Sequence, residues 1–236
     1  MMISPSFERW MGDYQYQSVL HEYRGKILPD HHPMVADVQR VMAKLIKVSG
    51  ITDVEWKIHV IADPRLPPNA FVLPGGKVFV FSSILPLCKN DDGLATVLAH
   101  ETAHQVARHT GEKMSRMPFT ILAVLGVSII TGSSRVISNL MALLFDLPSS
   151  RQMESEADYI GLLMMSQACF NPREAVAFWD RMSKAGLHAP LEYFSDHPSD
   201  ATRVEHIREW MPQATHAREL ANCQSAYEFM DAFRRF

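Results

Sequence analysis

The sequence has only three cysteines, and they lie far apart. Cys88, Cys169 and Cys223 are odd in number, and none belongs to a Cys-x-x-Cys pair. Disulfide-stapled small proteins and cysteine-based zinc sites typically show even numbers or close pairs of cysteines. The pattern predicts neither of these, and we expect reduced and mostly buried thiols.

The sequence also lacks an excess of charge of one sign. Its 23 Lys and Arg residues nearly balance its 26 Asp and Glu residues, for a formal net charge of -3. Nucleic-acid-binding domains usually carry a basic excess, so nucleic acid is not an expected partner. In a chain of 236 residues, 47% hydrophobic and 21% charged residues are typical of a folded globular protein. No linker or repeat divides the sequence, and we expect a single domain over 1–236.

No hydrophobic run reaches the roughly 20 residues that cross a bilayer. Residues 118–131 and 136–147 form two apolar stretches separated by Gly-Ser-Ser-Arg. They predict an apolar hairpin inserted between helices, which is either buried in the protein or dips into a membrane. The first ten residues show neither a signal peptide nor a transit segment. Either the protein needs no such signal, or the chain begins after one was removed.

Helical patterns dominate the sequence, and strand patterns are confined to one stretch. Apolar spacing with capping residues predicts helices, and β-branched and aromatic residues between chain breakers predict strands. The expected helices cover 5–24, 33–48, 93–109, 151–168, 172–186 and a segment from 197 onward, with a helical tail from 219. The expected strands cover 56–61, 71–73 and 77–81, the last two joined by a Pro-Gly-Gly turn. These elements predict a mostly helical α+β fold.

The segment HETAH at 100–104 points to a metal. Residues four apart on a helix lie on the same face, so His100 and His104 can both reach one ion at about 2.0–2.1 Å. Glu101 is offset around the helix, where it can take a proton from a metal-activated water without being a ligand. The alternative is a surface helix that happens to carry two histidines. The apolar residues around the pair favour a buried helix instead, in which unpaired polar groups are costly.

A third ligand is expected from a later helix. Glu154 and Glu156 both lie in 151–168, about 200° apart around the helix, so only one of them can face the histidines. Asp158 and Gly161 share the face of Glu154. A glycine there allows two helices to approach closely, and Asp158 can accept the second N–H of a ligating histidine. We therefore favour Glu154, which leaves a tetrahedral zinc with the open position that catalytic sites require.

Three separated motifs resemble those of a known family. HETAH at 100–104, ESEAD at 154–158 and HPSDATR at 197–203 together resemble metallopeptidase family 48, the gluzincins that include the CaaX prenyl protease and bacterial heat-shock membrane proteases. The resemblance implies a zincin-like peptidase domain whose small sheet has an edge strand beside the HExxH helix.

One branch of that family is especially similar. The segments NAF at 69–71, LPGGK at 73–77 and HEYRGKILP at 21–29 resemble its fungal mitochondrial inner-membrane members. That branch is named for activity overlapping that of the m-AAA protease. The resemblance implies residence in the mitochondrial inner membrane and a role in protein quality control.

The resemblance also implies roles for individual residues. His100, His104 and Glu154 match the ligands of one Zn²⁺ per chain, Glu101 matches the catalytic glutamate, and Asp158 matches an acid that supports the site.

The motif at 197–203 supplies two further residues. His197 matches a histidine that approaches the active site, and Arg203 matches an arginine that supports it. The family usually shows a small hydroxyl residue before that histidine, whereas this chain has Asp196. A carboxylate there could raise the pKa of His197 or change its pose.

The strand at 77–81 is expected to serve as a substrate platform. An exposed edge at Gly76, Lys77, Val78 and Phe79 would pair with an extended polypeptide through main-chain hydrogen bonds. The alternative is an ordinary core strand, because valines alternate with phenylalanines along it.

These expectations together predict a zinc metalloendopeptidase that cleaves membrane-associated or misfolded proteins, with membrane contact through 118–147. A non-catalytic zinc-binding scaffold or chaperone is the rival hypothesis. A latent state, in which His197 or another group occupies the open zinc position, is compatible with the first.

Overall fold

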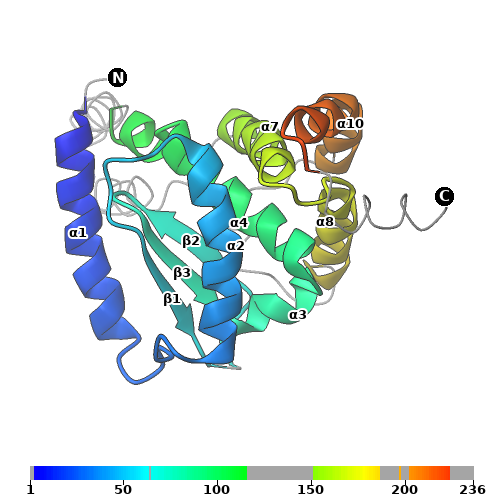
Figure 1. Ribbon diagram of the computed structural model, residues 1–236. Coiled ribbons are helices and arrows are strands. Elements are labelled where there is room, and N and C mark those ends of the chain that lie inside the picture. The colour runs from blue at the N-terminus through cyan, green and yellow to red at the C-terminus, as the bar shows by residue number, and fades with distance from the viewer. Residues whose placement is uncertain (1–2, 64, 116–150, 187–196, 198–201, 224–236) are drawn as a thin grey trace, which may run out of the picture.

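A computed structural model describes residues 3–63, 65–115, 151–186, 197 and 202–223. Two helices, α1 (Pro5–Glu22) and α2 (Pro33–Ser49), precede a small sheet, which is followed by a 3-10 turn, η1 (Ser82–Ile84), and a short helix, α3 (Leu85–Cys88). The remaining helices are α4 (Asp91–Val106), α7 (Arg151–Gln167), α8 (Arg173–Gly186) and α10 (Arg203–Leu220). The expected mostly helical α+β fold is confirmed (Figure 1).

The sheet contains the strands β1 (Lys57–Ile61), β2 (Ala70–Leu73) and β3 (Lys77–Phe81) in the order β1-β3-β2. Strand β3 runs parallel to β1 and antiparallel to β2. The turn between β2 and β3 needs two glycines, because Gly75 and Gly76 have φ angles of 84° and 78°. The two strands expected on either side of the Pro-Gly-Gly turn therefore pair as a β-hairpin.

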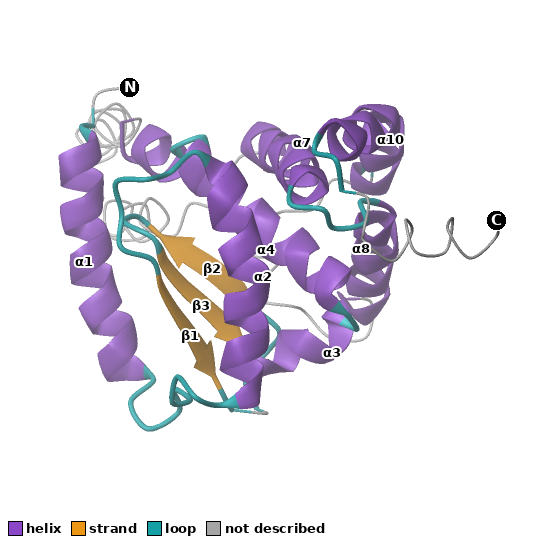
Figure 2. Ribbon diagram, viewed as in Figure 1, coloured by secondary structure: helices purple, strands orange, loops and turns teal. Residues whose placement is uncertain are grey.

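The central strand β3 packs against different helices on its two faces. Phe79 and Phe81 belong to a cluster with Ile61 and with side chains of α1. Val78 and Val80 face the main core, to which α2 and α4 contribute most of their buried side chains. The sheet therefore lies between α1 and the pair α2 and α4, and α7, α8 and α10 lie beyond α4 (Figure 2).

Several helix ends follow from capping residues in the sequence. Asn90 accepts a hydrogen bond from Gly93 N at 2.9 Å and begins α4. Asn171 accepts one from Arg173 N at 3.1 Å and begins α8. Gly50 ends α2 with a φ angle of 72°. Local hydrogen-bonding chemistry explains why these boundaries could be predicted.

Other expectations for the C-terminal part differ or are not described. The helix expected from 197 onward begins at Arg203 and ends at Leu220. The rest of the expected helical tail, like the apolar hairpin at 118–147, lies outside the described residues. Among the helices that are described, none combines the length and the hydropathy needed to cross a bilayer.

The expectation of three reduced cysteines is wrong for two of them. Cys169 and Cys223 form a disulfide across 54 residues of sequence, with their Cα atoms 5.2 Å apart. They follow α7 and α10, two helices that pack on each other, so the fold brings their ends together. Sequence spacing carries no trace of this long-range packing. Cys88 is free and buried, as expected.

Candidate metal and active site

Helix α4 carries the two histidines through the interior of the protein. All its residues from 93 to 103 are buried, and the side chains of His100 and His104 lie one turn apart on the same face. Their Nε2 atoms are 3.1 Å from each other. The i, i+4 spacing in the sequence therefore produces a pair of convergent imidazoles.

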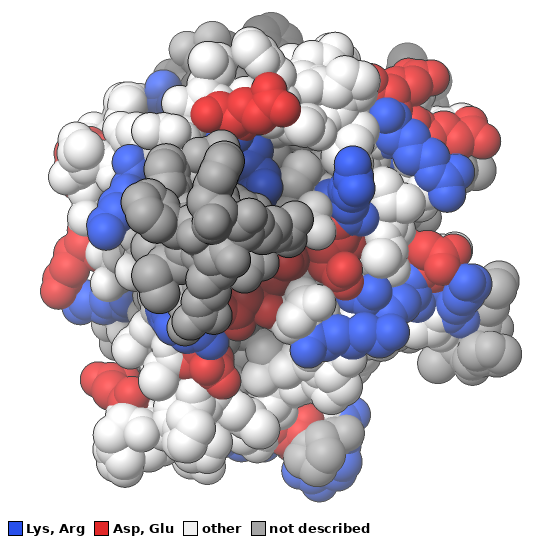
Figure 3. Space-filling view, turned by 45° about the vertical axis from the view of Figure 1, so that its right-hand side comes forward, with Lys and Arg blue, Asp and Glu red and all other residues white. Residues whose placement is uncertain are grey.

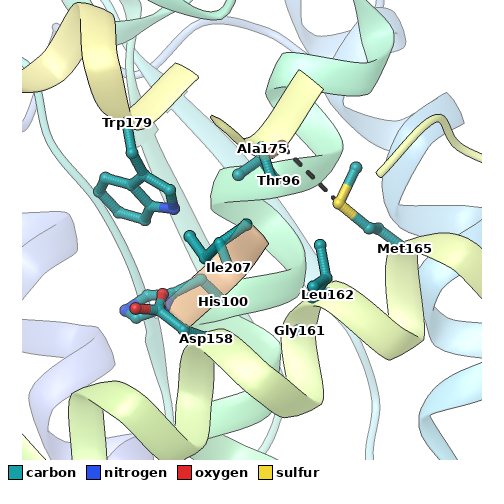
Figure 4. Close-up of a pocket in the computed structure, with 9 residues that line it drawn as sticks. All are labelled: Thr96, His100, Asp158, Gly161, Leu162, Met165, Ala175, Trp179 and Ile207. Atoms are coloured by element: carbon teal, nitrogen blue, oxygen red, sulfur yellow. Dashed lines mark hydrogen bonds and ion pairs between the residues drawn. The ribbon is translucent and has the colours of Figure 1, made fainter. Parts of the chain in front are cut away.

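Helix α7 brings the carboxylate to this pair. One Glu154 oxygen lies 3.2 Å from His100 Nε2, and the other lies 3.4 Å from His104 Nε2. The close approach depends on Gly161, where a Cβ atom would stand only 2.9 Å from the backbone nitrogen of His100. Figure 4 shows Gly161 in the turn of α7 that lies against α4, with Asp158 beside His100.

The arrangement of these atoms fits a tetrahedral cation. Ligand atoms bound to zinc at about 2.0–2.1 Å are separated from each other by roughly 3.4 Å in a tetrahedron. The two Nε2 atoms lie 3.1 Å apart, and each has one of the two Glu154 oxygens at a similar distance, 3.2 Å for His100 and 3.4 Å for His104. His197 is the fourth member of the group, and all four donor atoms lie within 4.8 Å of one another. The donor set therefore fits a metal.

Burial and charge shift the pKa values of these side chains in opposite directions. Burial opposes a charge on His100, but hydrogen bonds to Asp158 and Glu154 outweigh it and raise its pKa to about 9. Burial, followed by repulsion from His100, lowers the pKa of His104 well below its usual value. Burial works against ionisation of Glu154, yet its hydrogen bonds to His100 and His197 lower its pKa. The site therefore presents an ionised carboxylate that demands a positive partner.

An acid–base pair behind His100 fixes that ring. Asp158 accepts a hydrogen bond from His100 Nδ1 at 2.9 Å, which directs Nε2 toward Glu154. Arg203 of α10 contacts both Asp158 oxygens, at 2.6 and 2.7 Å. The guanidinium also stacks over Trp179 at 3.5 Å from the ring centroid. Burial opposes ionisation of Asp158, but Arg203 and His100 lower its pKa.

Glu101 and His197 complete the centre. Glu101 is buried on α4, and its Oε1 atom lies 3.5 Å from His197 Nε2. His197 Nδ1 lies 3.1 and 3.2 Å from the two Glu154 oxygens and 3.4 Å from His100 Nε2. The neighbouring Asp196 lies outside the described residues. The structure thus brings together all seven residues expected at or around the metal: His100, Glu101, His104, Glu154, Asp158, His197 and Arg203.

The expected substrate strand is not placed as predicted. Gly76, Lys77, Val78 and Phe79 belong to the turn and first part of β3, whose two edges are both paired and whose side chains are buried. A strand that is hydrogen-bonded on both sides has no edge for a peptide. Among the described strands, β2 lies at the edge of the sheet on that side of β3, and it packs beside α4.

Two contacting residues escaped the reasoning from sequence. His109 Nδ1 lies 2.7 Å from His104 Nδ1, and His109 Nε2 lies 3.3 Å from a Glu156 oxygen. Helical periodicity predicts that His109 points away from His104. It also predicts that Glu156 lies on the side of α7 opposite Glu154. Only the backbone turn at Arg108, where φ is 57°, brings them together.

On the face shown in Figure 3, basic and acidic side chains are interspersed, in keeping with the nearly balanced charge of the whole chain.

Comparison with known proteins places the chain in a family. The sequence profile of peptidase family M48 matches residues 34–211, which include the whole centre described above. Mitochondrial metalloendopeptidase OMA1 of Saccharomyces cerevisiae is 41% identical over 98% of this chain and 71% of the relative. Its Schizosaccharomyces pombe counterpart is 47% identical over 94% of this chain and 66% of the relative.

More distant relatives are longer than this chain. The human protein named metalloendopeptidase OMA1, mitochondrial, is 33% identical over 91% of this chain, which spans only 44% of the relative. The β-barrel assembly-enhancing protease of Escherichia coli K12 is 26% identical over 85% of this chain and 43% of its own length. With three quarters of its residues inside the matched region and close fungal relatives along nearly its full length, the chain belongs to peptidase family M48.

Proposed function

We propose that this chain is a mitochondrial zinc metalloendopeptidase, with His100, His104 and Glu154 as the metal ligands and Glu101 as the general base. The observation that carries the proposal is the convergence of two imidazoles and one carboxylate beside Glu101, a buried glutamate outside this donor set. The names of the fungal relatives, which describe mitochondrial metalloendopeptidases, support the activity and the compartment. Inner-membrane residence follows by resemblance.

The donor set supports zinc as the metal. Two imidazole nitrogens and one carboxylate oxygen match the ligands found in catalytic zinc sites, which keep one position free of strong protein ligands. When bound, the metal lowers the pKa of water and polarises the scissile carbonyl.

The side chains around the metal supply proton transfer, oxyanion stabilisation and ligand orientation. Glu101 takes the proton from the attacking water and passes it to the leaving amine, as a carboxylate beside the site but outside the ligand set can do. His197, which contacts Glu154 and approaches Glu101, is placed to donate to the oxyanion that develops on the carbonyl. Asp158 and Arg203 hold His100 in its ligating orientation.

The contacts of His197 also support the latent arrangement. Its Nδ1 atom stands as close to Glu154 and His100 as those groups stand to each other, so the ring can fill the fourth ligand position. We propose that this ring has two positions, one that closes the site and one that assists the reaction.

Protein substrates are proposed to bind along β2. Within the described part of the chain, this strand is paired on one side only and lies beside helix α4, so its outer edge can add an extended polypeptide as a further strand. Main-chain pairing of this kind accepts many sequences, which suits the removal of misfolded proteins. Membrane-protein substrates and membrane contact through 118–147 remain part of the proposal, on the hydropathy of that segment.

The Glu101→Gln variant tests the proposal. The amide cannot take a proton, so we expect casein cleavage to fall by about 100-fold or more, while zinc content stays near one per chain because Glu101 is not a ligand. Glu209→Gln, an exposed site on α10, is the matched control and should cleave normally.

The result that would refute the general base is a Glu101→Gln variant that cleaves at the wild-type rate. A wild-type protein that binds zinc but cleaves no unfolded substrate would instead favour the non-catalytic scaffold.

A further inference from the structure

Helix α4 ends just after the second histidine, at an unusual turn. The helix stops at Val106, and a second helical segment covers 109–115. Between them, Arg108 adopts a φ angle of 57°, which is uncommon for a residue with a side chain. In an uninterrupted helix, residues five apart point about 140° away from each other. The turn cancels this offset and points His109 back at His104.

The hydrogen positions in this contact can be assigned from the partners. The Glu156 carboxylate can only accept, so His109 Nε2 donates to it. A contact between two ring nitrogens needs one hydrogen and one lone pair, and a buried ring whose Nε2 hydrogen points at Glu156 presents the lone pair of its Nδ1 atom to His104. That lone pair accepts the Nδ1 hydrogen of His104 across 2.7 Å. His104 is thereby held as the tautomer whose Nε2 lone pair faces Glu154 and His100.

We infer that His109 and Glu156 are positioning residues for the metal site, which orient His104 as Asp158 orients His100. The inference rests on the proposed function, because it needs His104 to be a ligand. The two ligand histidines are then supported differently. His100 is backed directly by a buried carboxylate, whereas His104 is backed by a neutral imidazole whose own carboxylate partner, Glu156, is about half exposed.

The first helix anchors this arrangement. Arg108 donates to both oxygens of Glu8, at 2.9 and 3.2 Å, and to the carbonyl of Ile3 at 3.0 Å. These contacts span about 100 residues of sequence and hold the left-handed turn that aims His109. The start of α1 is therefore connected to the proposed metal site through a chain of contacts that runs from Arg108 to His109 and His104. Strained backbone of this kind persists only where the surroundings enforce it.

Substitutions at His109 separate orientation from simple packing. His109→Leu replaces the ring with an apolar side chain of similar volume and removes the Nδ1 acceptor. In His109→Asn, the amide oxygen can accept from His104 and the amide nitrogen keeps a donor. A packing role predicts that Leu is tolerated at least as well as Asn, because the site is buried. An orienting role predicts the reverse order.

The measurement is zinc affinity of the metal-free protein, by titration against a competing chromogenic chelator, together with the visible absorption spectrum of the cobalt-substituted protein. We expect His109→Leu to weaken zinc binding by about 10–100-fold and to change the cobalt spectrum. His109→Asn should recover most of the affinity. Glu156→Ala should weaken zinc binding several-fold. Because Glu156 is about half exposed, this variant should fold even if His109→Leu does not.

The matched control is His59→Leu. His59 is a half-buried histidine hydrogen-bonded to Tyr16 at 2.9 Å in the layer between α1 and the sheet. It should lose stability without changing the cobalt spectrum. Wild-type affinity and an unchanged spectrum in His109→Leu and Glu156→Ala would overturn the inference and leave the proposed function intact. A wild-type protein that binds no zinc would overturn both.

Discussion

Gly161, which has no side chain, sets the spacing of the two helices that carry the proposed ligands. At Gly161 the backbone of α7 lies against α4, and an added Cβ atom would stand 2.9 Å from His100 N and 3.1 Å from Ala99 C. Both neighbours are backbone atoms in the middle of a buried helix, so neither can move aside cheaply. The geometry of the metal site therefore depends on a residue that takes no part in its chemistry.

Gly161→Ala should consequently damage metal binding as well as stability. The methyl group forces α7 away from α4, which moves the Glu154 carboxylate off the histidine pair. We expect the free energy of unfolding to fall by about 1–3 kcal/mol and the zinc affinity of the folded protein to fall as well. Chemical denaturation and chelator competition measure the two effects separately.

Gly93→Ala provides the comparison. A Cβ atom there would stand 2.0 Å from the carbonyl oxygen of Cys88, so this variant is overpacked even more severely, but it lies two turns before His100. It should lose stability and keep its zinc affinity. Equal zinc affinities in the two variants would show that the spacing at Gly161 does not control the site.

At the scale of elements, local signals were readable from sequence and long-range pairings were not. Asn90 and Asn171 predicted helix starts because a cap is made by atoms within three residues. The placement of Glu154, rather than Glu156, toward the histidines followed from helical periodicity, which puts Asp158 and Gly161 on the same face as Glu154.

The errors share one cause. The central position of β3 depends on which strands pair across the sheet, and that choice is not written in the strand itself. The disulfide and the contact of His109 likewise arise from packing between distant segments, or from one left-handed residue. Residues that follow helical periodicity or belong to the family's motifs were therefore predictable, whereas a contact made across a left-handed turn was not.

The three cysteines allow the packing of α7 on α10 to be tested by counting thiols. Burial raises the pKa of the Cys88 thiol to about 12, so almost no thiolate exists at pH 8 and alkylation should be negligible in the folded protein. The disulfide protects Cys169 and Cys223. Mass spectrometry after treatment with iodoacetamide should find no label on the native protein, one label after denaturation, and three after denaturation with reduction.

Cys88→Ala sharpens this count. Without reductant it should take up no label even when denatured, and with reductant it should take up two. Two further labels on denatured wild-type protein without reductant would mean that the ends of α7 and α10 are not joined, and that the pairing of these helices needs revision.

At the scale of the whole molecule, the proposed metal site lies between two layers of one continuous hydrophobic core. His100 and His104 come from α4, which packs on α2 and the sheet, whereas Glu154 and Asp158 come from α7, with Arg203 from α10 behind them. A bound ion adds its free energy to the contact between these layers. A ligand present at 1,000 times its dissociation constant stabilises the folded state by about 4 kcal/mol, which is a large part of the stability of a domain of this size.

Metal removal should therefore lower stability in a way that depends on pH. In the metal-free protein the pKa of His100 is raised to about 9, against about 6.5 in the unfolded chain. The imidazolium contributes stability that is fully present below pH 6.5 and is lost as the pH rises through 9. The loaded protein should not show this loss, because the metal takes the place of the proton, and protons compete with it increasingly as the pH falls.

The difference in unfolding free energy between the loaded and the chelated protein should accordingly widen from pH 6.5 to pH 9, as measured by denaturant titration with and without a chelator. Glu101→Gln should show the same widening, because Glu101 is not among the proposed ligands. A difference that stays constant across this range would mean that no proton leaves His100 when the metal binds. The ring would then be neutral before the metal arrives, and the positive partner that Glu154 requires in the metal-free protein would have to come from Arg203, whose nitrogen lies 3.8 Å from Glu154.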